Sequence, residues 1–455
     1  MQIFPVLLLY LINFTVFTRA CRIYLTIALT GKTLEDSNLE INWGPYCRQL
    51  PAWVGVYRDD PSVSHIQPDV SYTAELQNTS GKIVTTVKIG KIRFPSGWNR
   101  NDSNVVPVDY PKGKCLPFYV AAFNGTELLS VECLKIKPNW MSKFDKHMPW
   151  IPLKNLFIPG THASGAYYHN RGKNKSLLIR DYAATQYFDV WSQLIFGIRF
   201  LDLSIGYDIS YKLNPHSDKN FWIVNEHKFI NPLKDILRDV RRFVTLSHEL
   251  VIVDFSSFPM GFYKHPERHS DLFRVIRDEI GDLVYQRMPD EKGKLPHCYE
   301  LSINNITSTG KYILLIYPPE ELPYPENESN ILCPTWKRFT TSFMNTSQTL
   351  DYMRLLFSKR PTSPVQDEGW IFHAVRGMEL SLNSHEKLQT SRERACTINP
   401  KLNSWLYGPW SATANVVALD YFTNTDLIDI ALYANLNKAY QMKYNDLMYF
   451  EIATK

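Results

Sequence analysis

The first part of the chain alternates between apolar and polar residues in short segments. Between residues 22 and 137 these segments include RIYLTIAL, LEINW, WVGVY, KIVTTVKIG and LLSVECLKI, and turn-forming stretches such as DDPS and PSGWNRNDSN separate them. A period of two indicates β-strands with one buried face. About a hundred residues of this pattern are typical of a β-sandwich. We therefore predict a small all-β sandwich domain at residues 21–137.

The pattern changes after a polar, Pro-containing stretch at residues 138–150, which we predict to be a linker. Continuous apolar segments now alternate with helical periods. The apolar segments are NLFIPG, GIRFLDLS, FWIVNEH, ELVIVDFSSF, YILLIYPP, WIFHAV and NVVALDYF. Helix-like segments such as PLKDILRDVRRFVTL lie between them, and this alternation indicates a parallel sheet. We predict an α/β domain at residues 151–455, a distorted (β/α)8 TIM-like barrel. An open doubly wound sheet is the alternative, although no Gly-rich dinucleotide fingerprint follows the first strand.

The N-terminal residues and the cysteines indicate export. An apolar core from Ile3 to Phe17, with small residues at Thr18 and Ala20, predicts a signal peptide at residues 1–20, with an uncleaved anchor as the alternative. The cysteines form one group before residue 140 and another after it, without the spacing of a zinc site. They are Cys21, Cys47, Cys115, Cys133, Cys298, Cys333 and Cys396. We expect disulfides, with one odd Cys, in a secreted, extracellular protein.

Possible glycan sites and the overall charge refine this prediction. Beyond the predicted signal peptide, Asn-X-Ser/Thr sequons begin at Asn78, Asn101, Asn124, Asn174, Asn305, Asn327 and Asn345, each in a polar, turn-like stretch. We therefore expect a glycoprotein. The net charge of +5 is too small and too dispersed to indicate nucleic-acid binding, and it is compatible with approach to an anionic membrane surface.

Polar residues at the predicted strand ends form an acid–base set. In a (β/α) barrel, catalytic groups gather at the C-terminal ends of the strands. The predicted strands bring there His162, Asp202, His227 with Glu226 and Lys228, Asp254, His373 with Arg376, and Asp420. Two imidazoles that face a phosphodiester can share the work, because one takes the proton of the attacking hydroxyl and the other protonates the leaving oxygen. A cation must hold the phosphoryl oxygens. As the alternative, each His could be a hydrogen-bonded structural residue, and Asp254 or Asp420 could cap a turn.

The motifs IPGTHASGAY, GIRFLDL, HELVIVDFSSF and NVVALDYF, with a His on the third strand, occur in this order. Together they resemble the X-domain of phosphatidylinositol-specific phospholipases C. The chain is most similar to the X-domain-containing proteins of animals, and its β-module resembles that of secreted arthropod members. The resemblance covers residues 145–440 well and 22–137 loosely. It implies a distorted (β/α) barrel that cleaves an inositol phospholipid to a cyclic inositol phosphate and a diacylglycerol.

The resemblance also implies roles for single residues. His162 would be the general base on the inositol 2-hydroxyl, and Asp420 would pair with it. His227 would be the general acid, and Asp202 would organise the phosphate site. The further candidates for substrate binding are Lys228, Asp254 and Arg376.

Two positions depart from the family pattern. Ala163 stands where the family usually has Asp or Asn, which in bacterial relatives supports the general-acid His. Ser204 stands where the family usually has an Arg that clamps the phosphate. Neither side chain resembles the Asn, Glu and Asp ligands of the calcium-dependent branch, so we expect no metal and no cofactor.

Three functions remain open from the sequence. The first is a phosphoric diester hydrolase for an inositol phospholipid or related phosphodiester at a membrane surface, weakened or retuned, with Lys228 or Arg376 as the replacement cation. The second is a catalytically degenerate relative that binds lipid headgroups. The third is a secreted structural or adhesion protein whose β-module is the functional part. The retained His162, His227, Asp202 and Asp420 favour the first, whereas Ala163 and Ser204 favour the second.

Overall fold

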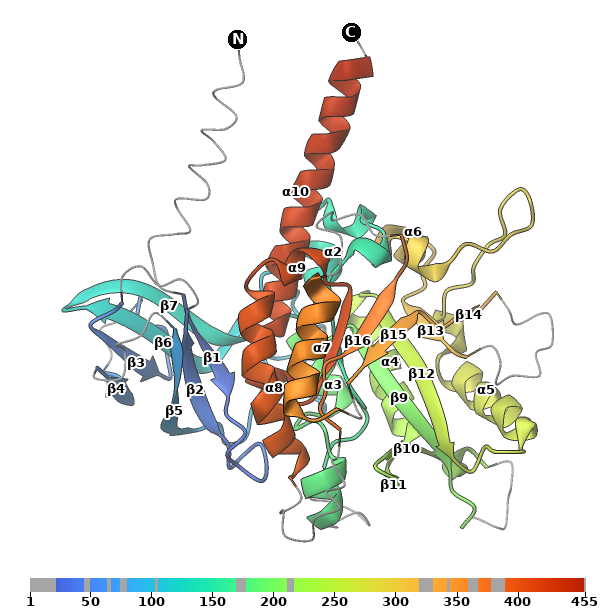
Figure 1. The fold of residues 1–455 in the computed structure, drawn as a ribbon, viewed down its shortest axis with the longest axis horizontal. Coiled ribbons are helices and arrows are strands. Elements are labelled where there is room, and N and C mark those ends of the chain that lie inside the picture. The colour runs from blue at the N-terminus through green and yellow to red at the C-terminus, as the bar shows by residue number, and fades with distance from the viewer. Residues whose placement is uncertain are drawn as a thin grey trace. The chain divides into compact units, whose positions relative to one another are not determined.

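The structure, a computed structural model, divides the chain into two compact units (Figure 1). It describes residues 22–44, 50–63, 67–73, 80–102, 105–168, 177–210, 217–318, 330–341, 344–358, 367–377 and 389–453. The first unit consists of the described part of Met1–Phe94 together with Lys114–Ile136 and Thr423–Asp426, and the second contains the rest. The predicted signal peptide, Cys21, Cys47, Asn78, Asn174 and Asn327 lie outside the described residues.

The first unit contains antiparallel sheets. In one sheet the strand order is β1 (Ile23–Ile27), β2 (Asn38–Trp43) and β5 (Gly81–Lys88). In the other it is β4 (Val70–Tyr72), β3 (Trp53–Tyr57), β6 (Lys114–Asn124) and β7 (Glu127–Ile136). The Cys115–Cys133 disulfide joins β6 to β7, and Trp53 of β3 stacks on Phe123 of β6 with ring centroids 4.1 Å apart. A β-sandwich domain with boundaries 21–137 stays a prediction.

Residues 138–150, predicted as a linker, are folded as part of the second unit. They contain α2 (Trp140–Lys143) and the 3-10 helix η1 (Met148–Trp150). Trp140, Met141 and Met148 are completely buried in the core of this unit. The segment is polar on average, but these few large apolar side chains fix it to the core.

The second unit is built on a curled parallel sheet. Among the described residues its parallel strands are β8 (Ile158–Thr161), β9 (Phe200–Tyr207), β12 (Val251–Met260), β13 (Ile313–Ile316), β14 (Leu332–Cys333), β15 (Lys337–Thr340), β16 (Trp370–His373) and β17 (Val416–Leu419). Strand β17 pairs with β8, so the last strand lies beside the first, as a barrel requires. In the part of the chain that the structure describes, no ladder joins β14 to β15, and the barrel is open there. The predicted α/β, barrel-like fold class is confirmed.

Helices of this unit pack against one another around the sheet. They are α3 (Val190–Phe196), α4 (Leu233–Ser247), α5 (Pro266–Ile280), α6 (Ile303–Thr307), α7 (Thr346–Ser358), α8 (Ser391–Leu406), α9 (Trp410–Thr413) and α10 (Leu427–Ala453). Figure 1 shows α7 and α8 together, and α5 beyond β12. Helix α4 is amphipathic, with Ile236, Leu237, Val240 and Val244 on its buried face. Within the described ranges, no helix is both long and apolar enough to span a bilayer.

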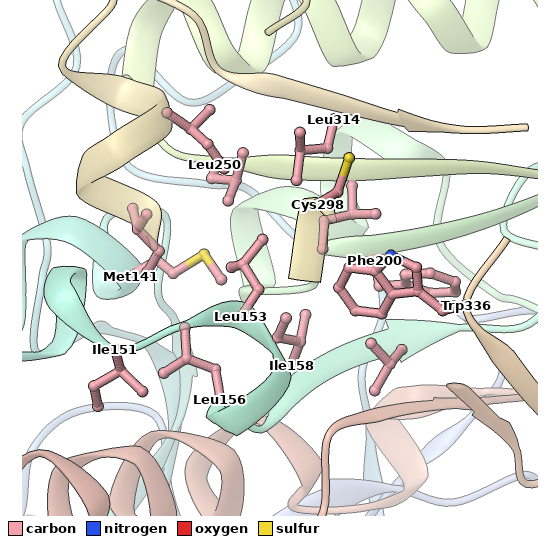
Figure 2. Close-up of a cluster of buried hydrophobic side chains, with 14 of the residues drawn as sticks. Met141, Ile151, Leu153, Leu156, Ile158, Phe200, Leu250, Cys298, Leu314 and Trp336 are labelled. Atoms are coloured by element: carbon pink, nitrogen blue, oxygen red, sulfur yellow. The ribbon is translucent and has the colours of Figure 1, made fainter. Parts of the chain in front are cut away.

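The side chains of the parallel strands form layers, because successive residues of a strand point to opposite faces. One layer belongs to a large apolar cluster (Figure 2). The cluster includes Ile158, Phe200, Leu250, Ile252, Leu314, Trp336, Ile371 and Val416. The residues two positions after members of this cluster on β9, β12 and β16 are Asp202, Asp254 and His373. The apolar core therefore holds the strands that carry these polar residues.

Arg199, from the GIRFLDL motif, has a structural role. Its side chain is completely buried, and it forms an ion pair with the equally buried Glu249 at 2.9 Å. It also donates to the carbonyl oxygens of Leu194, Ile198 and Pro138. Glu249 in turn accepts hydrogen bonds from the backbone N–H groups of Met141 and Ser142. A buried ion pair needs such additional partners to offset its desolvation.

Candidate active site

The His162 imidazole and the Asp420 carboxylate form a close pair. His162 follows β8 and Asp420 follows β17, and the parallel pairing of these strands places both side chains at the same end of the sheet. His162 Nδ1 lies 2.8 Å from Asp420 Oδ1. Burial alone would lower the pKa of His162, but the negative charges of Asp420, Asp202 and Glu226 outweigh it and raise this pKa to about 9. His162 is therefore an imidazolium at neutral pH.

Ala163 contributes to the site through its backbone. Its φ of 42° lies in the left-handed region, and its N–H donates to Asp202 Oδ2 at 2.9 Å. Asp202 is buried, which would raise its pKa, but the imidazoles of His373 and His162 and the Ala163 N–H lower it below the ordinary value. Asp202 is therefore an ionised carboxylate. The residue at position 163 stabilises this charge through its backbone N–H group, for which an alanine is sufficient.

A second imidazole, that of His373, lies beside His162. The two ring centroids are 5.7 Å apart and the rings are tilted by 55°. His373 lies at the end of β16, and its Nε2 is 3.9 Å from Asp202 Oδ2. Burial lowers the pKa of His373 well below its ordinary value; Asp202 opposes this effect, and the positive charges of His162 and Arg338 add to it. His373 is therefore neutral when His162 is charged.

His227, predicted as the general acid, lies in a hairpin turn. The segment FWIVNEH is not one of the parallel strands, because β10 (Phe221–Asn225) runs antiparallel to β9 and turns into β11 (Lys228–Pro232). Glu226 and His227 are the turn residues, with φ values of 47° and 57°. His227 and Lys228 are exposed. Glu226 is half-buried, and its charge acts on His162, so the turn directs Glu226 toward the site.

Asp254 holds an arginine that the sequence analysis did not consider. Asp254 is completely buried on β12, next to Asp202 in the parallel register with β9. Its Oδ1 accepts a hydrogen bond from Arg338 of β15 at 2.6 Å. Burial raises the pKa of Asp254 to about 6, although the charge of Arg338 opposes this rise. The segment WKRFTT has no long apolar run, so β15 was not predicted and Arg338 was missed.

Two further candidates, Arg376 and Ser204, form hydrogen bonds with other side chains. Arg376 follows β16 and donates to the side chain of Gln389. Ser204 Oγ lies 2.8 Å from Ser257 Oγ, so this position on β9 is neutral. Within the described ranges, no group of three or more His, Cys, Asp or Glu side chains is arranged to hold a metal ion. That the site uses no metal or cofactor stays a prediction.

Comparison with known proteins gives one consistent similarity, although no family model matches the chain. The chain is 24% identical over 320 residues to PI-PLC X domain-containing protein 1 of Homo sapiens, which covers 64% of this chain and 90% of that protein. It is 30% identical over 196 residues to the Danio rerio protein of the same name, covering 38% of this chain and 61% of the relative. PI-PLC X domain-containing protein 3 of Homo sapiens is 25% identical over 211 residues, which is 41% of this chain and 63% of the relative.

Solved structures of bacterial phosphatidylinositol-specific phospholipases C are also similar. A double mutant of the S. aureus enzyme has a TM-score of 0.47 and 16% identity, covering 66% of this chain and 96% of that chain. The Listeria monocytogenes enzyme has a TM-score of 0.46 and 17% identity, covering 65% of this chain and 98% of that chain. A particular similarity to secreted arthropod members of the family stays a prediction. In its sequence matches and its motifs, this chain is similar to the PI-PLC X domain-containing proteins.

Proposed function

We propose that this protein is a phosphoric diester hydrolase of the phosphatidylinositol-specific phospholipase C type. The observation that carries the proposal is the pair of imidazoles, His162 and His373, whose ring centroids are 5.7 Å apart. Asp420 Oδ1 lies 2.8 Å from Nδ1 of His162, and Asp202 Oδ2 lies 3.9 Å from Nε2 of His373. A phosphodiester that lies along the edge of this imidazole pair could exchange protons with both rings. The relatives, which are named for a PI-PLC X domain, support an inositol phospholipid at a membrane surface as the substrate.

The proposed reaction forms one P–O bond and breaks another. The inositol 2-hydroxyl attacks the phosphorus, and its proton passes to one imidazole. The bond from phosphorus to the glycerol oxygen breaks, and this oxygen takes a proton from the other imidazole. The products are a cyclic inositol phosphate and a diacylglycerol. The site regains its starting protonation when the first imidazole releases its proton and the second takes one up.

The protonation states favour His373 as the acceptor and His162 as the donor. This order is the reverse of the one that the family resemblance implies for His162. The pKa of His162 is about 9, and that of His373 lies below its ordinary 6.5. The reverse order would need the less populated protonation state, in which His162 is neutral and His373 is charged. We therefore propose His373 in place of His227 as the partner of His162.

The rate of phosphatidylinositol cleavage should depend on pH in a characteristic way. We expect kcat/KM to stay level through neutral pH and to fall above about pH 9, where His162 loses its proton. In Asp420→Asn the loss of the negative charge lowers the pKa of His162, so the fall should begin at lower pH. The measurement is kcat/KM against pH for the wild type and this variant. If kcat/KM falls at the same pH in the wild type and in Asp420→Asn, the proposed role of Asp420 is contradicted.

The proposed function itself is tested with purified protein and two lipids. Cleavage of phosphatidylinositol vesicles, or of a glycosylated inositol lipid, should release a cyclic inositol phosphate. Binding of these vesicles without product would instead favour a degenerate relative that recognises headgroups, which Ala163 and Ser204 make the second candidate. If the protein neither binds nor cleaves these vesicles, the β-rich first unit becomes the candidate functional part.

We also propose that the protein is secreted and glycosylated. The described residues contain the Cys115–Cys133 and Cys298–Cys333 disulfides, which are typical of oxidising compartments. The sequon residues in the described part of the chain are exposed. They are Asn101, Asn124, Asn305 and Asn345.

Protein made by animal cells from the full sequence should therefore appear in the medium. Treatment with an N-glycosidase should increase its mobility on a gel, because each glycan adds mass. The same protein with all seven sequon Asn residues changed to Gln is the control and should not shift. Retention of unglycosylated protein in the cytosol would contradict this prediction.

A further inference from the structure

We propose that Arg338 is the phosphate-binding cation of this site, in place of the arginine that the family usually carries at the position of Ser204. The inference rests on the proposed hydrolase function. A phosphodiester carries a negative charge that grows on the phosphoryl oxygens during transfer, and a guanidinium can hold two of these oxygens at once. At the family position, Ser204 and Ser257 offer two neutral hydroxyl groups.

The position of Arg338 on β15 directs its side chain toward the site. Trp336, two residues earlier, belongs to the apolar cluster, so Arg338 points to the same face, one layer nearer the imidazoles. Its guanidinium reaches Asp254 on β12, which lies beside Asp202 in the register with β9. Its charge also lowers the pKa of His373. Arg338 is therefore within electrostatic reach of the imidazole pair.

Arg338 differs from the structural arginine of the same unit. The Arg199 side chain has no exposed surface, and its ion pair with Glu249 is completely covered. Arg338 has the same kind of buried partner, since Asp254 is 0% exposed, but its own side chain is 21% exposed. Asp254 thus anchors one side of the guanidinium, while another part of the side chain is accessible to a ligand.

The same layer contains polar atoms that are buried without a hydrogen-bond partner. In the part of the chain that the structure describes, Asp254 Oδ2 and His373 Nε2 are buried without a hydrogen-bond partner. Such atoms are rare in folded proteins because each is costly to bury. Their cost is in keeping with a polar functional site, and the phosphate of a ligand would lie against the exposed part of Arg338.

The other candidate cations are less well placed. Lys228 is exposed on the β10–β11 hairpin, and Arg376 donates to Gln389. Arg394 of α8 lies 3.6 Å from Glu226, whose negative charge it faces. None of these three contacts Asp254 or Asp202 through a described ion pair, whereas Arg338 does.

The test separates a phosphate clamp from a purely structural ion pair. The double variant Arg338→Gln/Asp254→Asn replaces the ion pair by two neutral amides that can still hydrogen-bond. We expect it to keep its melting temperature, to lose about 10²-fold in kcat/KM on phosphatidylinositol, and to lose the thermal stabilisation that inorganic phosphate gives the wild type. The kcat/KM of Arg338→Lys should lie between those of the wild type and the double variant, because lysine keeps the charge but not the planar fork.

A matched control removes an ion pair elsewhere on the same unit. Arg274→Gln/Asp271→Asn neutralises an exposed pair on α5 and should change neither readout. A double variant at 338 and 254 that keeps wild-type activity and phosphate stabilisation would overturn the clamp and leave the hydrolase intact. If the wild type does not hydrolyse the lipid but phosphate stabilises it, and the double variant loses this stabilisation, the proposed phosphate-binding role of Arg338 is kept and the proposed hydrolase function is rejected.

Discussion

Replacing His162 by Ala should lower the turnover of phosphatidylinositol by about 10²–10⁴ while the protein stays folded. The reason is that the imidazolium held by Asp420 at 2.8 Å is the proposed source of the leaving-group proton. Its side chain is 22% exposed, so the deletion leaves a space that water can enter rather than a dry cavity. Asp420→Ala should also lower turnover, and the double variant should lose far less than the product of the two effects, because both residues act as one unit.

The measurement is single-substrate kinetics together with circular dichroism and melting temperature. His265→Ala is the matched control, because His265 also lies close to a carboxylate, that of Glu267, but on the exposed surface. Wild-type turnover in a folded His162→Ala protein would show that this imidazole takes no part in proton transfer. Multiplicative losses for the two variants would show that Asp420 acts independently of His162.

His373→Ala should cause a loss of similar size, about 10²–10⁴, whereas His227→Ala should change turnover less than about threefold. The two residues form a natural pair for comparison, because the family resemblance implies His227 and the geometry favours His373. His227 lies in an exposed turn, whereas the ring centroid of His373 lies 5.7 Å from that of His162. His373 is also the group that is neutral at physiological pH and can accept the hydroxyl proton.

Both variants are measured with the same vesicles, and their melting temperatures show whether the fold is kept. His373→Asn is a useful addition, since it keeps a polar group near Asp202 but cannot accept a proton at neutral pH. If His227→Ala abolished turnover and His373→Ala did not, the hairpin would have to close over the site during catalysis. The assignment of the acid–base pair would then return to His162 and His227.

Most of the barrel could be predicted because its strands are buried on both faces. Segments such as GIRFLDLS, ELVIVDFSSF and NVVALDYF are continuous apolar runs, and they correspond to β9, β12 and β17. The amphipathic period of PLKDILRDVRRFVTL likewise corresponds to α4. Strand β15 was not predicted because KRFT begins with two charged residues and has no apolar run, and it lies at the open side of the barrel. The segment FWIVNEH was predicted as a strand, but its direction depends on pairing with β9, which the sequence does not contain.

The sequence by itself determined the fold class and the positions of polar residues at strand ends, because both follow from local periodicity and chain order. His162 and Asp420 lie 258 positions apart, and the expectation that they pair came from the family resemblance. In the structure, the pairing of β17 with β8 brings them together. Which side chains share one layer was decided by the tertiary structure. The curl of the sheet brings Arg338 to Asp254 and His373 to His162, and the turn of a hairpin leaves His227 exposed. Charges and burial act through space, so the protonation of each imidazole depends on neighbours that are distant in the chain.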